Sequence, residues 1–311
     1  MNIGIVITAY NSEGNLPRAV AALRQTQAHI SVIVIDDHSA RDVFGLLQEF
    51  HRLANFKFLR LDRNVGPADA RNFGILLSRE CDALTFHDHD DLPLPDKLEK
   101  QCAALRQTKE IDELRRATIA AHLSLETEIV VSRVVRRERD GTEQIAGAMI
   151  YLLRDLYPNA YGDFGASGRK YSLHTVSSLF RKTIFRRLGG FYPALYHYED
   201  NELAARFIAA GANFNFLPDA LYEFNKTDDS LTYQRTEKDD APLVEIFRRI
   251  ARMRTDTPRM SPAEFVAAYR VKINSPARVE FAYNFDKSDC DDAIPADEDF
   301  RRELFAALGR R

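Results

Sequence analysis

Apolar and polar positions in the first hundred residues form blocks that predict strands and helices in alternation. Continuous apolar runs rich in β-branched residues, which are typical of strands buried on both faces, occupy positions 3–7 and 31–35. Two further strand candidates occupy positions 56–61 and 82–86. Apolar residues at helical spacing occupy positions 15–25, 43–50 and 69–80. This alternation predicts an α/β fold with an open, mostly parallel central sheet flanked by helices.

The segment VFGLLQEF at 43–50 shows the helical pattern most clearly. Its apolar residues recur at intervals of three and four, which is the spacing of one helical face. We therefore expect a helix here that buries Val43, Leu46, Leu47 and Phe50.

The second hundred residues combine helical, strand and loop patterns. The segment at 128–147 alternates around a turn signal at Asp140–Gly141 and predicts a hairpin. Positions 151–173 are rich in Tyr, Gly and Asn and predict a loop. The remaining segments predict a helix at 96–107, a strand and short helix at 175–191, a helix at 199–211 and a strand at 214–218.

The composition changes beyond residue 231, where charged helical patterns replace the strand and helix alternation. We expect one large domain at 1–231 and a mainly helical C-terminal appendage at 232–311. The appendage carries a basic stripe, which predicts either peripheral contact with anionic lipid or a solvated helix face, made of Arg248, Arg249, Arg252 and Arg254.

Bulk properties narrow the class of protein. A formal net charge of −3 argues against a nucleic-acid-binding protein. The three cysteines form no CxxC pair, and no apolar run reaches the length of a leader peptide or a membrane span. These features predict a cytoplasmic protein with reduced thiols, and they say nothing of its oligomeric state.

Polar residues follow three of the predicted strands directly. The stretches are TAYN at 8–11, DDHS at 36–39 and HDHDD at 87–91. Ligands of open α/β sheets bind outside the carboxyl ends of the strands, so these stretches predict one site. The loop at 63–72 adds two arginines, which indicates an anionic ligand such as a diphosphate bridged by a cation.

The same polar residues also fit roles unrelated to a diphosphate. Asp36 and Asp37 could cap the next helix, and 87–91 could be a solvated acidic turn. The histidines of HDHDD, with His174 and His197, could also assemble a transition-metal site of a phosphoester hydrolase.

Six motifs in order favour the ligand-binding roles over these alternatives. They are ITAYN, VIDDHS, NVGPADARN, FHDHDD, GGF and YEDNELAAR, spread over residues 3–231. In type, order and spacing they resemble the family 2 glycosyltransferases of the GT-A fold. The resemblance implies an inverting transfer of a sugar from a nucleoside-diphosphate donor, most often a UDP-sugar, to a hydroxyl of a glycan or glycoconjugate, with Mg²⁺ or Mn²⁺. It also implies a nucleotide-binding half at 1–100 and an acceptor half at 101–231.

The resemblance assigns roles to individual residues on the sugar-donor side. Asp37 would hydrogen-bond the base, Asp88 would face the ribose, and Arg71 would lie near the nucleotide or diphosphate. The remaining residues of the nucleotide site would be Thr8, Ala9, Tyr10 and Gly66.

The same resemblance assigns the metal and the base. Asp90 would bind the metal beside the diphosphate, because a hard cation offsets the charge of the leaving group. Asp200 would be the general base, with Glu199 beside it as a substrate contact. Asp91 would support the acidic loop and Arg206 would brace the helix.

The chain departs from the family pattern in two places. His87 and His89 stand where the family usually has an apolar and a small residue. Thr227 stands where the family often has a His that contacts metal or diphosphate, and Lys226 could supply charge there instead. A non-catalytic nucleotide-sugar-binding module that keeps Asp37 and Asp88 is a further alternative, although Asp90 and Asp200 are both present.

Overall fold

The computed structural model describes residues 1–23, 28–48, 50, 55–107, 126–137, 143–146, 174–191, 199–200, 203–204, 207 and 212–225. In this part of the chain the strands are β1 (Ile3–Ala9), β2 (Ile30–Asp36), β3 (Phe56–Arg60), β4 (Ala83–Asp88), β5 (Leu92–Pro93), β6 (Ile129–Arg137), β7 (Glu143–Ala146), β8 (Ser178–Arg181) and β9 (Phe214–Asn225). The helices are α1 (Leu16–Ala22), α2 (Pro67–Leu77), α3 (Lys97–Leu105) and α7 (Lys182–Leu188), with single 3₁₀ turns η2 (Gly45–Leu47) and η5 (Thr175–Ser177).

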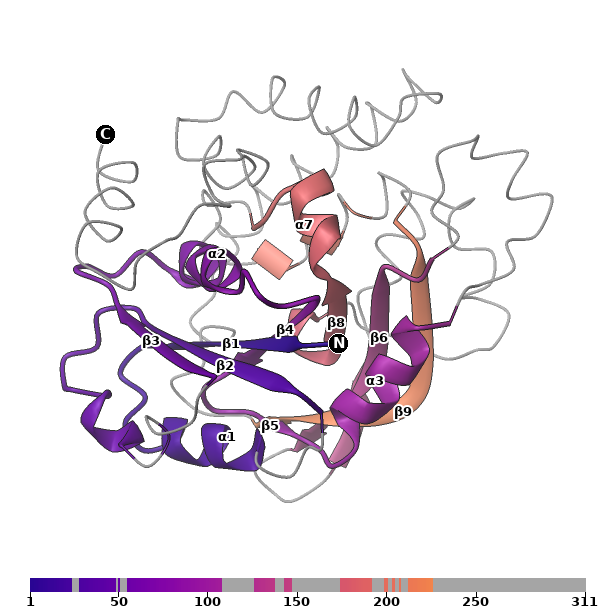
Figure 1. Cartoon of the computed structure of the whole chain (residues 1–311). Helices are drawn as coiled ribbons and strands as arrows, with labels where there is room; N and C mark the ends of the chain where they lie inside the picture. Colours follow the sequence, from indigo (N-terminus) through magenta and orange to yellow (C-terminus); the bar gives the residue numbers. More distant parts are fainter. Residues whose placement is uncertain are drawn as a thin grey trace, which may run out of the picture.

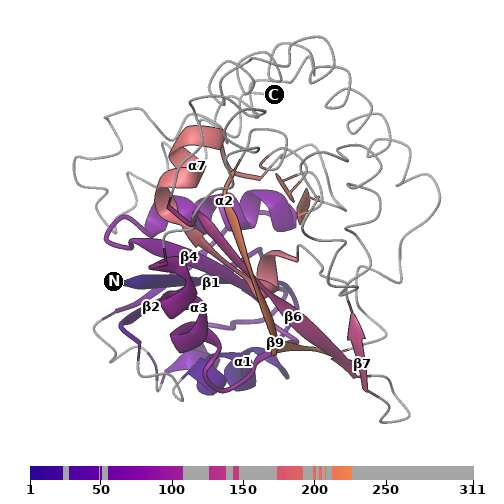
Figure 2. The same ribbon diagram turned by 90° about the vertical axis from the view of Figure 1, so that its right-hand side faces the viewer.

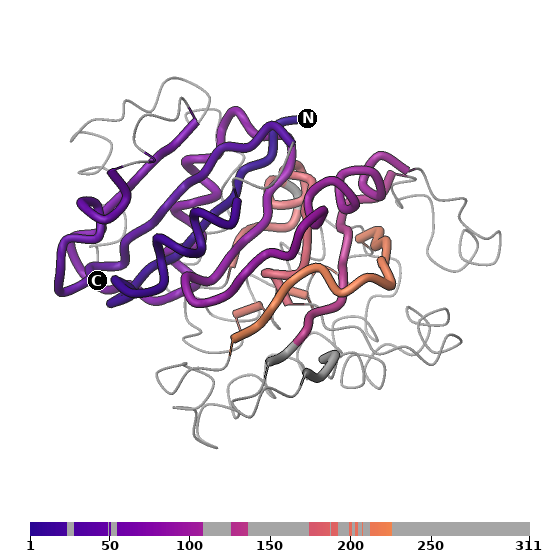
Figure 3. Tube along the Cα trace, turned by 90° about the horizontal axis from the view of Figure 1, so that it is seen from below, coloured from indigo at the N-terminus to yellow at the C-terminus, as the bar shows by residue number. Residues whose placement is uncertain are grey.

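The described strands form one mixed sheet in the order β3-β2-β1-β4-β8-β6-β9-β5, with β7 beside β6. The first four strands pair in parallel, as the alternating pattern of the sequence predicts. Strand β8 then pairs antiparallel with both β4 and β6, and β6 pairs in parallel with β9. Seen from below, β1 to β3 lie on one side of the molecule and β9 on the other (Figure 3).

The register of the parallel strands lines up their polar ends. Thr8 of β1 lies opposite Asp88 of β4, and Ala9 lies opposite Asp36 of β2. The residues that follow β1, β2 and β4 therefore leave the sheet at the same edge, where ligands bind in open α/β folds.

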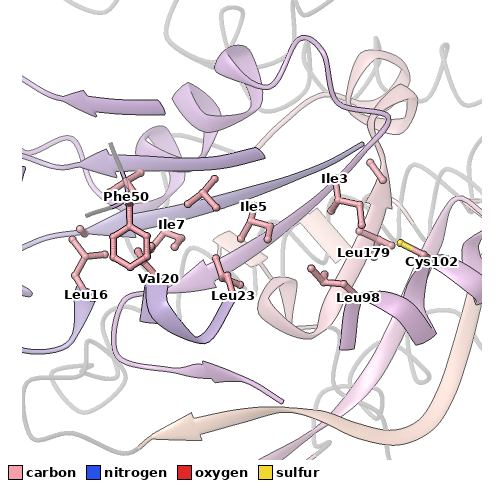
Figure 4. Close-up of a cluster of buried hydrophobic side chains, with 14 of the residues drawn as sticks. Ile3, Ile5, Ile7, Leu16, Val20, Leu23, Phe50, Leu98, Cys102 and Leu179 are labelled. Carbon is pink, nitrogen blue, oxygen red and sulfur yellow. The ribbon is translucent and has the colours of Figure 1, made fainter. Parts of the chain in front are cut away.

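One face of β1 contributes to a large cluster of buried apolar residues. Ile3, Ile5 and Ile7 alternate along the strand and are fully buried. They point toward α1 and toward Leu98 and Cys102 of α3 (Figure 4). Burial of each isoleucine stabilises the fold by roughly 1.5–3 kcal/mol. Residues two apart in a strand point to the same face, so all three isoleucines face these helices.

The opposite face of the sheet carries α2 and α7 (Figure 1). Helix α2 can approach β1 closely because Gly74 has no side chain. A Cβ at this position would lie 2.2 Å from Cγ1 of Val6. Next to this contact, Phe86 of β4 packs edge-on against Phe185 of α7 and Phe191.

The segment at 43–50 differs from the predicted helix. Among its described residues it forms the 3₁₀ turn η2, and just before this turn Oδ1 of Asp42 accepts the N–H of Phe44 at 2.9 Å. Val43, Leu47 and Phe50 are buried, but Leu46 is 43% exposed. The prediction for Leu46 was wrong because a single 3₁₀ turn does not continue the helical spacing that would place it on the buried face.

The hairpin predicted at 128–147 is confirmed, since β6 and β7 pair antiparallel; Figure 2 shows β7 beside the far end of β6. Strand β9 spans 12 residues and is longer than the predicted strand at 214–218. The predicted loop at 151–173 and the appendage at 232–311 lie outside the described residues. Within the described part, no helix has the length and apolar character needed to cross a bilayer.

Candidate active site

Asp37 fixes the loop between β3 and α2 to the end of β2. Its carboxylate accepts the backbone N–H groups of Val65 at 2.7 Å and Gly66 at 2.9 Å. Gly66 has a φ of 85°, which glycine adopts without the strain of a side chain. Burial raises the pKa of Asp37 to about 6, although these two N–H groups act in the opposite direction.

Asp36 braces a neighbouring loop. Its side chain is fully buried and accepts the N–H of Ser39 and a guanidinium hydrogen of Arg60, both at 2.9 Å. The observed partners of Asp36 and Asp37 are thus loop groups, and helix capping does not explain either acid.

Arg71 is the centre of the buried charge network. It lies on α2, is 5% exposed, and forms ion pairs with Asp88 at 2.8 Å and with Glu199. Its guanidinium carbon also lies 5.5 Å from the centre of the Phe191 ring. The neighbouring acids Asp88, Glu199 and Asp200 hold the pKa of Arg71 above its ordinary value. Arg71 therefore joins the end of β4 to the acids predicted to lie across the sugar donor.

Glu199 and Asp200 meet this network from a distant part of the chain. Burial raises the pKa of Glu199 to about 7, against the opposing effect of Arg71. The Oδ2 atom of Asp200 lies 3.4 Å from Nδ1 of His174, and both side chains remain partly exposed. The structure thus brings Asp88, Arg71, Glu199 and Asp200 together.

The acidic stretch is held in place by β9. The N–H of Asp88 donates to the hydroxyl of Tyr222 at 3.2 Å. The backbone N–H of Asn225 donates to Asp91 at 2.8 Å, and its side-chain amide donates to the carbonyl of Asp90 at 3.0 Å. The predicted role of Asp91 as a support of this loop agrees with its position.

The charges of this stretch fit a cation. The Oδ2 atom of Asp91 is buried and has no hydrogen-bond partner among the described residues. Burial, together with the charges of Asp88 and Asp90, raises the pKa of Asp91 well above its ordinary range. A divalent ion beside these acids would relieve the repulsion, and carboxylate oxygens are the ligands that Mg²⁺ and Mn²⁺ prefer.

Comparison with known proteins identifies the family. The sequence profile of the family described as "Glycosyl transferase family 2" matches residues 4–189, which is more than half of the chain. The chain belongs to glycosyl transferase family 2. Its fold is the GT-A fold, which explains the parallel first half and the antiparallel additions of the sheet.

Named relatives agree with this family. A Haemophilus influenzae protein called "Uncharacterized glycosyltransferase" is 36% identical over 101 residues, which cover 32% of this chain and 40% of that protein. The "Succinoglycan biosynthesis protein ExoO" of Rhizobium meliloti is 35% identical over 100 residues, which cover 32% of this chain and 28% of that protein. Both alignments span less than half of each relative.

Solved structures show the same fold. S. aureus TarS in complex with UDP-GlcNAc superposes with a TM-score of 0.58 at 17% identity, covering 80% of this chain and 66% of that one. S. aureus TarS in complex with UDP superposes with a TM-score of 0.53 at 17% identity, covering 98% and 72%.

The remaining residues predicted for the nucleotide site lie at the end of β1. Thr8 is half-buried and Ala9 is buried, while Tyr10 is 46% exposed. The carbonyl of Ala9 accepts the N–H of Asp37 at 2.8 Å, so β1 and β2 are tied together at the edge of the sheet where the nucleotide site is predicted. Arg206, Lys226 and Thr227 lie outside the described residues.

The histidines of the acidic stretch have other partners than a metal cluster. His87 is buried with Nε2 3.1 Å from Nζ of Lys97, and Nδ1 of His89 lies 3.3 Å from the carbonyl of Thr8. No group of three or more His, Cys, Asp or Glu that could hold a metal occurs among the described residues, and His197 lies outside them.

Reasoning from the sequence missed three residues that shape this site. Tyr222 and Asn225 position the acidic stretch from β9, and Lys97 lies buried behind it with Nζ 3.0 Å from Oγ1 of Thr85. No local signal marks the first two. Lys97 occupies an apolar position of the α3 pattern, which is the signal that could have indicated a buried lysine.

Proposed function

We propose that this protein is an inverting glycosyltransferase. It transfers a sugar from a nucleoside-diphosphate donor, for which we propose a UDP-sugar, to a hydroxyl of a glycan or glycoconjugate. The observation that carries the proposal is the buried Arg71 network, which joins Asp88 at the end of β4 to Glu199 and Asp200. The UDP-GlcNAc and UDP complexes of TarS and the succinoglycan role in the name of ExoO support the classes of donor and acceptor.

The sugar-donor side uses the carboxyl ends of β1, β2 and β4. Asp37 would contact the base through lone pairs that the N–H groups of Val65 and Gly66 leave available, with Thr8, Ala9 and Tyr10 around it. Asp88 would contact the ribose, because its side chain is 30% exposed while one oxygen is held by Arg71. Arg71 then acts on the nucleotide site by orienting Asp88.

Asp90 would hold the divalent metal. Such an ion supplies positive charge for the diphosphate as it leaves, and it is commonly held by one or two carboxylates with phosphate oxygens completing the shell. Asn225 holds the backbone carbonyl of Asp90 and the side chain of Asp91, so the carboxylate of Asp90 is presented from a fixed loop.

Asp200 would be the general base. As the acceptor oxygen forms its bond to the anomeric carbon, its proton passes to the Asp200 carboxylate, and the bond from that carbon to the diphosphate breaks with the electron pair leaving on the diphosphate. Attack from the face opposite the leaving group inverts the anomeric carbon. Arg71 supports this role because it interacts electrostatically with Asp200 and so links the proposed base to the donor side of the site.

Binding of UDP with and without Mn²⁺ tests the donor and metal assignments. We expect Mn²⁺ to tighten the Kd measured by calorimetry, and Asp90→Asn to remove this gain. Asp96→Asn is the matched control, because Asp96 is exposed, lies nearby and has a φ of 62° that asparagine tolerates. If the Kd for UDP changed neither on addition of Mn²⁺ nor in Asp90→Asn, the metal role would be contradicted.

Turnover tests the activity itself. We expect the full chain with Mn²⁺ to release UDP from at least one of UDP-GlcNAc, UDP-glucose and UDP-galactose, slowly with water and faster with a glycan acceptor. A protein that binds UDP-sugars tightly but never releases UDP would instead be a binding module.

A further inference from the structure

We propose that His174 is the positioning residue of Asp200: its Nδ1–H donates to the Asp200 carboxylate and holds it for proton transfer. This inference rests on the proposed role of Asp200 as general base. The observation behind it is the 3.4 Å separation between Nδ1 of His174 and Oδ2 of Asp200, two residues 26 positions apart in the chain.

The backbone of His174 is anchored. Its carbonyl accepts three hydrogen bonds: from the N–H of Ser177 at 3.1 Å and from the hydroxyls of Ser177 and Ser178 at 3.1 and 2.9 Å. The carbonyl of Ser177 in turn accepts from Gln101 of α3 and Ser132 of β6. The ring of His174 therefore projects from a turn that is tied to two other elements of the fold.

The ring itself rests on β9. It stacks on Phe224 with 6.4 Å between ring centroids and 20° between ring planes. The next residue, Asn225, donates its N–H to Asp91 and its side-chain amide to the carbonyl of Asp90. One short stretch of β9 thus supports both the metal-side acids and the imidazole that faces Asp200.

This arrangement sets the direction of the hydrogen bond. An ionised carboxylate only accepts, so the contact requires the proton on Nδ1 of His174, and a hydrogen bond of this kind selects the tautomer of the ring. A carboxylate held by a hydrogen bond to one oxygen keeps the orientation that proton transfer to it requires. Misplacement of a catalytic group by about 1 Å can cost 10²-fold in rate.

Three variants separate the hydrogen bond from the stacking. His174→Asn keeps a side-chain N–H near the place of Nδ1 but removes the ring. His174→Phe keeps a ring on Phe224 but removes the donor, and His174→Ala removes both. If His174 only supports the fold, the phenylalanine variant should be active and the asparagine variant impaired.

We expect the opposite order. In UDP release from the UDP-sugars named above, His174→Phe should lower kcat about 10- to 100-fold, with the Kd for UDP unchanged. His174→Asn should retain most of the activity, and His174→Ala should behave like the phenylalanine variant. Wild-type kcat in His174→Phe, or equal loss in His174→Asn and His174→Phe, would overturn the proposal.

A second measurement does not require activity. In ¹⁵N NMR of the full chain, which has eight histidines, the signal of His174 is assigned by its loss in His174→Asn. The ring of His174 should be in the Nδ1–H form. Asp200→Asn should shift it toward the Nε2–H form. An Nε2–H ring in the wild type, or no response to Asp200→Asn, would overturn the proposal. If no UDP-sugar binds or turns over, the proposed function fails, while the NMR result still decides whether His174 holds Asp200.

Discussion

At the scale of single residues, the site depends on one buried positive charge and the acids around it. A guanidinium taken out of water is costly unless its charge is matched, and Arg71 is matched by Asp88 and Glu199. Because the two acids come from strand β4 and from a segment over a hundred residues later, the pair also joins the two sides of the proposed site.

Arg71→Met should be strongly destabilising. It leaves Asp88 and Glu199 without their partner, and removal of one member of a buried ion pair typically costs about 3–5 kcal/mol. Denaturant unfolding measures this free energy. Lys100→Met is the control, since its pair with Asp219 is exposed and its loss should change stability little. Equal effects of the two substitutions would contradict the importance of the buried network.

Asp200→Asn should abolish turnover and leave binding intact. The amide cannot take up the acceptor proton, so we expect UDP release to fall by about 10²-fold or more, while the Kd for UDP stays near that of the wild type. The variant keeps the shape of the side chain beside His174. A loss of UDP affinity equal to the loss of turnover would show that Asp200 belongs to the nucleotide site and is not the base.

At the scale of elements, α2 positions the network because it lies directly on β1. Asp37 holds the two N–H groups before the helix, Gly74 allows close approach in its middle, and Arg71 lies between them. The helix begins with Pro67, whose fixed φ suits a first turn. A shift of α2 would therefore move Arg71 and, with it, Asp88.

Gly74→Ala tests this close packing. Its Cβ would lie 2.2 Å from Cγ1 of Val6, so helix or strand must move, and overpacking of this kind costs about 1–3 kcal/mol. Gly14→Ala is the control, because nothing lies within 4 Å of its Cβ position. Thermal unfolding should show a lower Tm for Gly74→Ala and an unchanged Tm for Gly14→Ala. Adding Val6→Ala to Gly74→Ala should restore part of the lost Tm. Equal Tm values for the two alanine variants would contradict the packing argument.

At the scale of the whole molecule, the two parts of the sheet meet where β8 pairs with β4. Lys97 lies behind this junction, buried, with Nζ near Thr85 and His87 of β4 and 5.4 Å from the centre of the Tyr222 ring of β9. Burial lowers the pKa of Lys97 from 10.5 to about 7. The amine thus links β4, α3 and β9, and the free energy required to bury it depends on pH.

The free energy of unfolding should rise with pH above 7. Between about 7 and 10.5 the unfolded chain keeps the proton of Lys97 and the folded protein has lost it, so stability increases by up to about 1.4 kcal/mol per pH unit. Burial also lowers the pKa of Lys182, to about 8. The difference between wild type and Lys97→Met, followed by denaturant unfolding from pH 7 to 9, separates the contribution of Lys97 from that of Lys182. Lys100→Met should keep the wild-type slope. A Lys97→Met protein with an unchanged slope would contradict a depressed pKa.

The strands, most helices and the hairpin could be predicted because their signals are local. Runs such as 3–7 and 31–35 are buried on both faces and carry the β-branched residues that such strands favour. Leu46 could not be predicted, since its exposure depends on the turn that follows Asp42. The antiparallel pairing of β8 with β4 and β6 could not be predicted either, because a short strand carries no signal of its direction.

For the site, the sequence alone determined which acids follow which strands, and the family motifs determined the roles we propose for them. The tertiary structure decided how those charges are paired. Arg71 pairs with Glu199, 128 residues away, and His174 faces Asp200. The reason is physical: residue order and periodicity specify local conformation, whereas the partner of a buried charge is set by the strands and helices that pack beside it, however far away they lie in the chain.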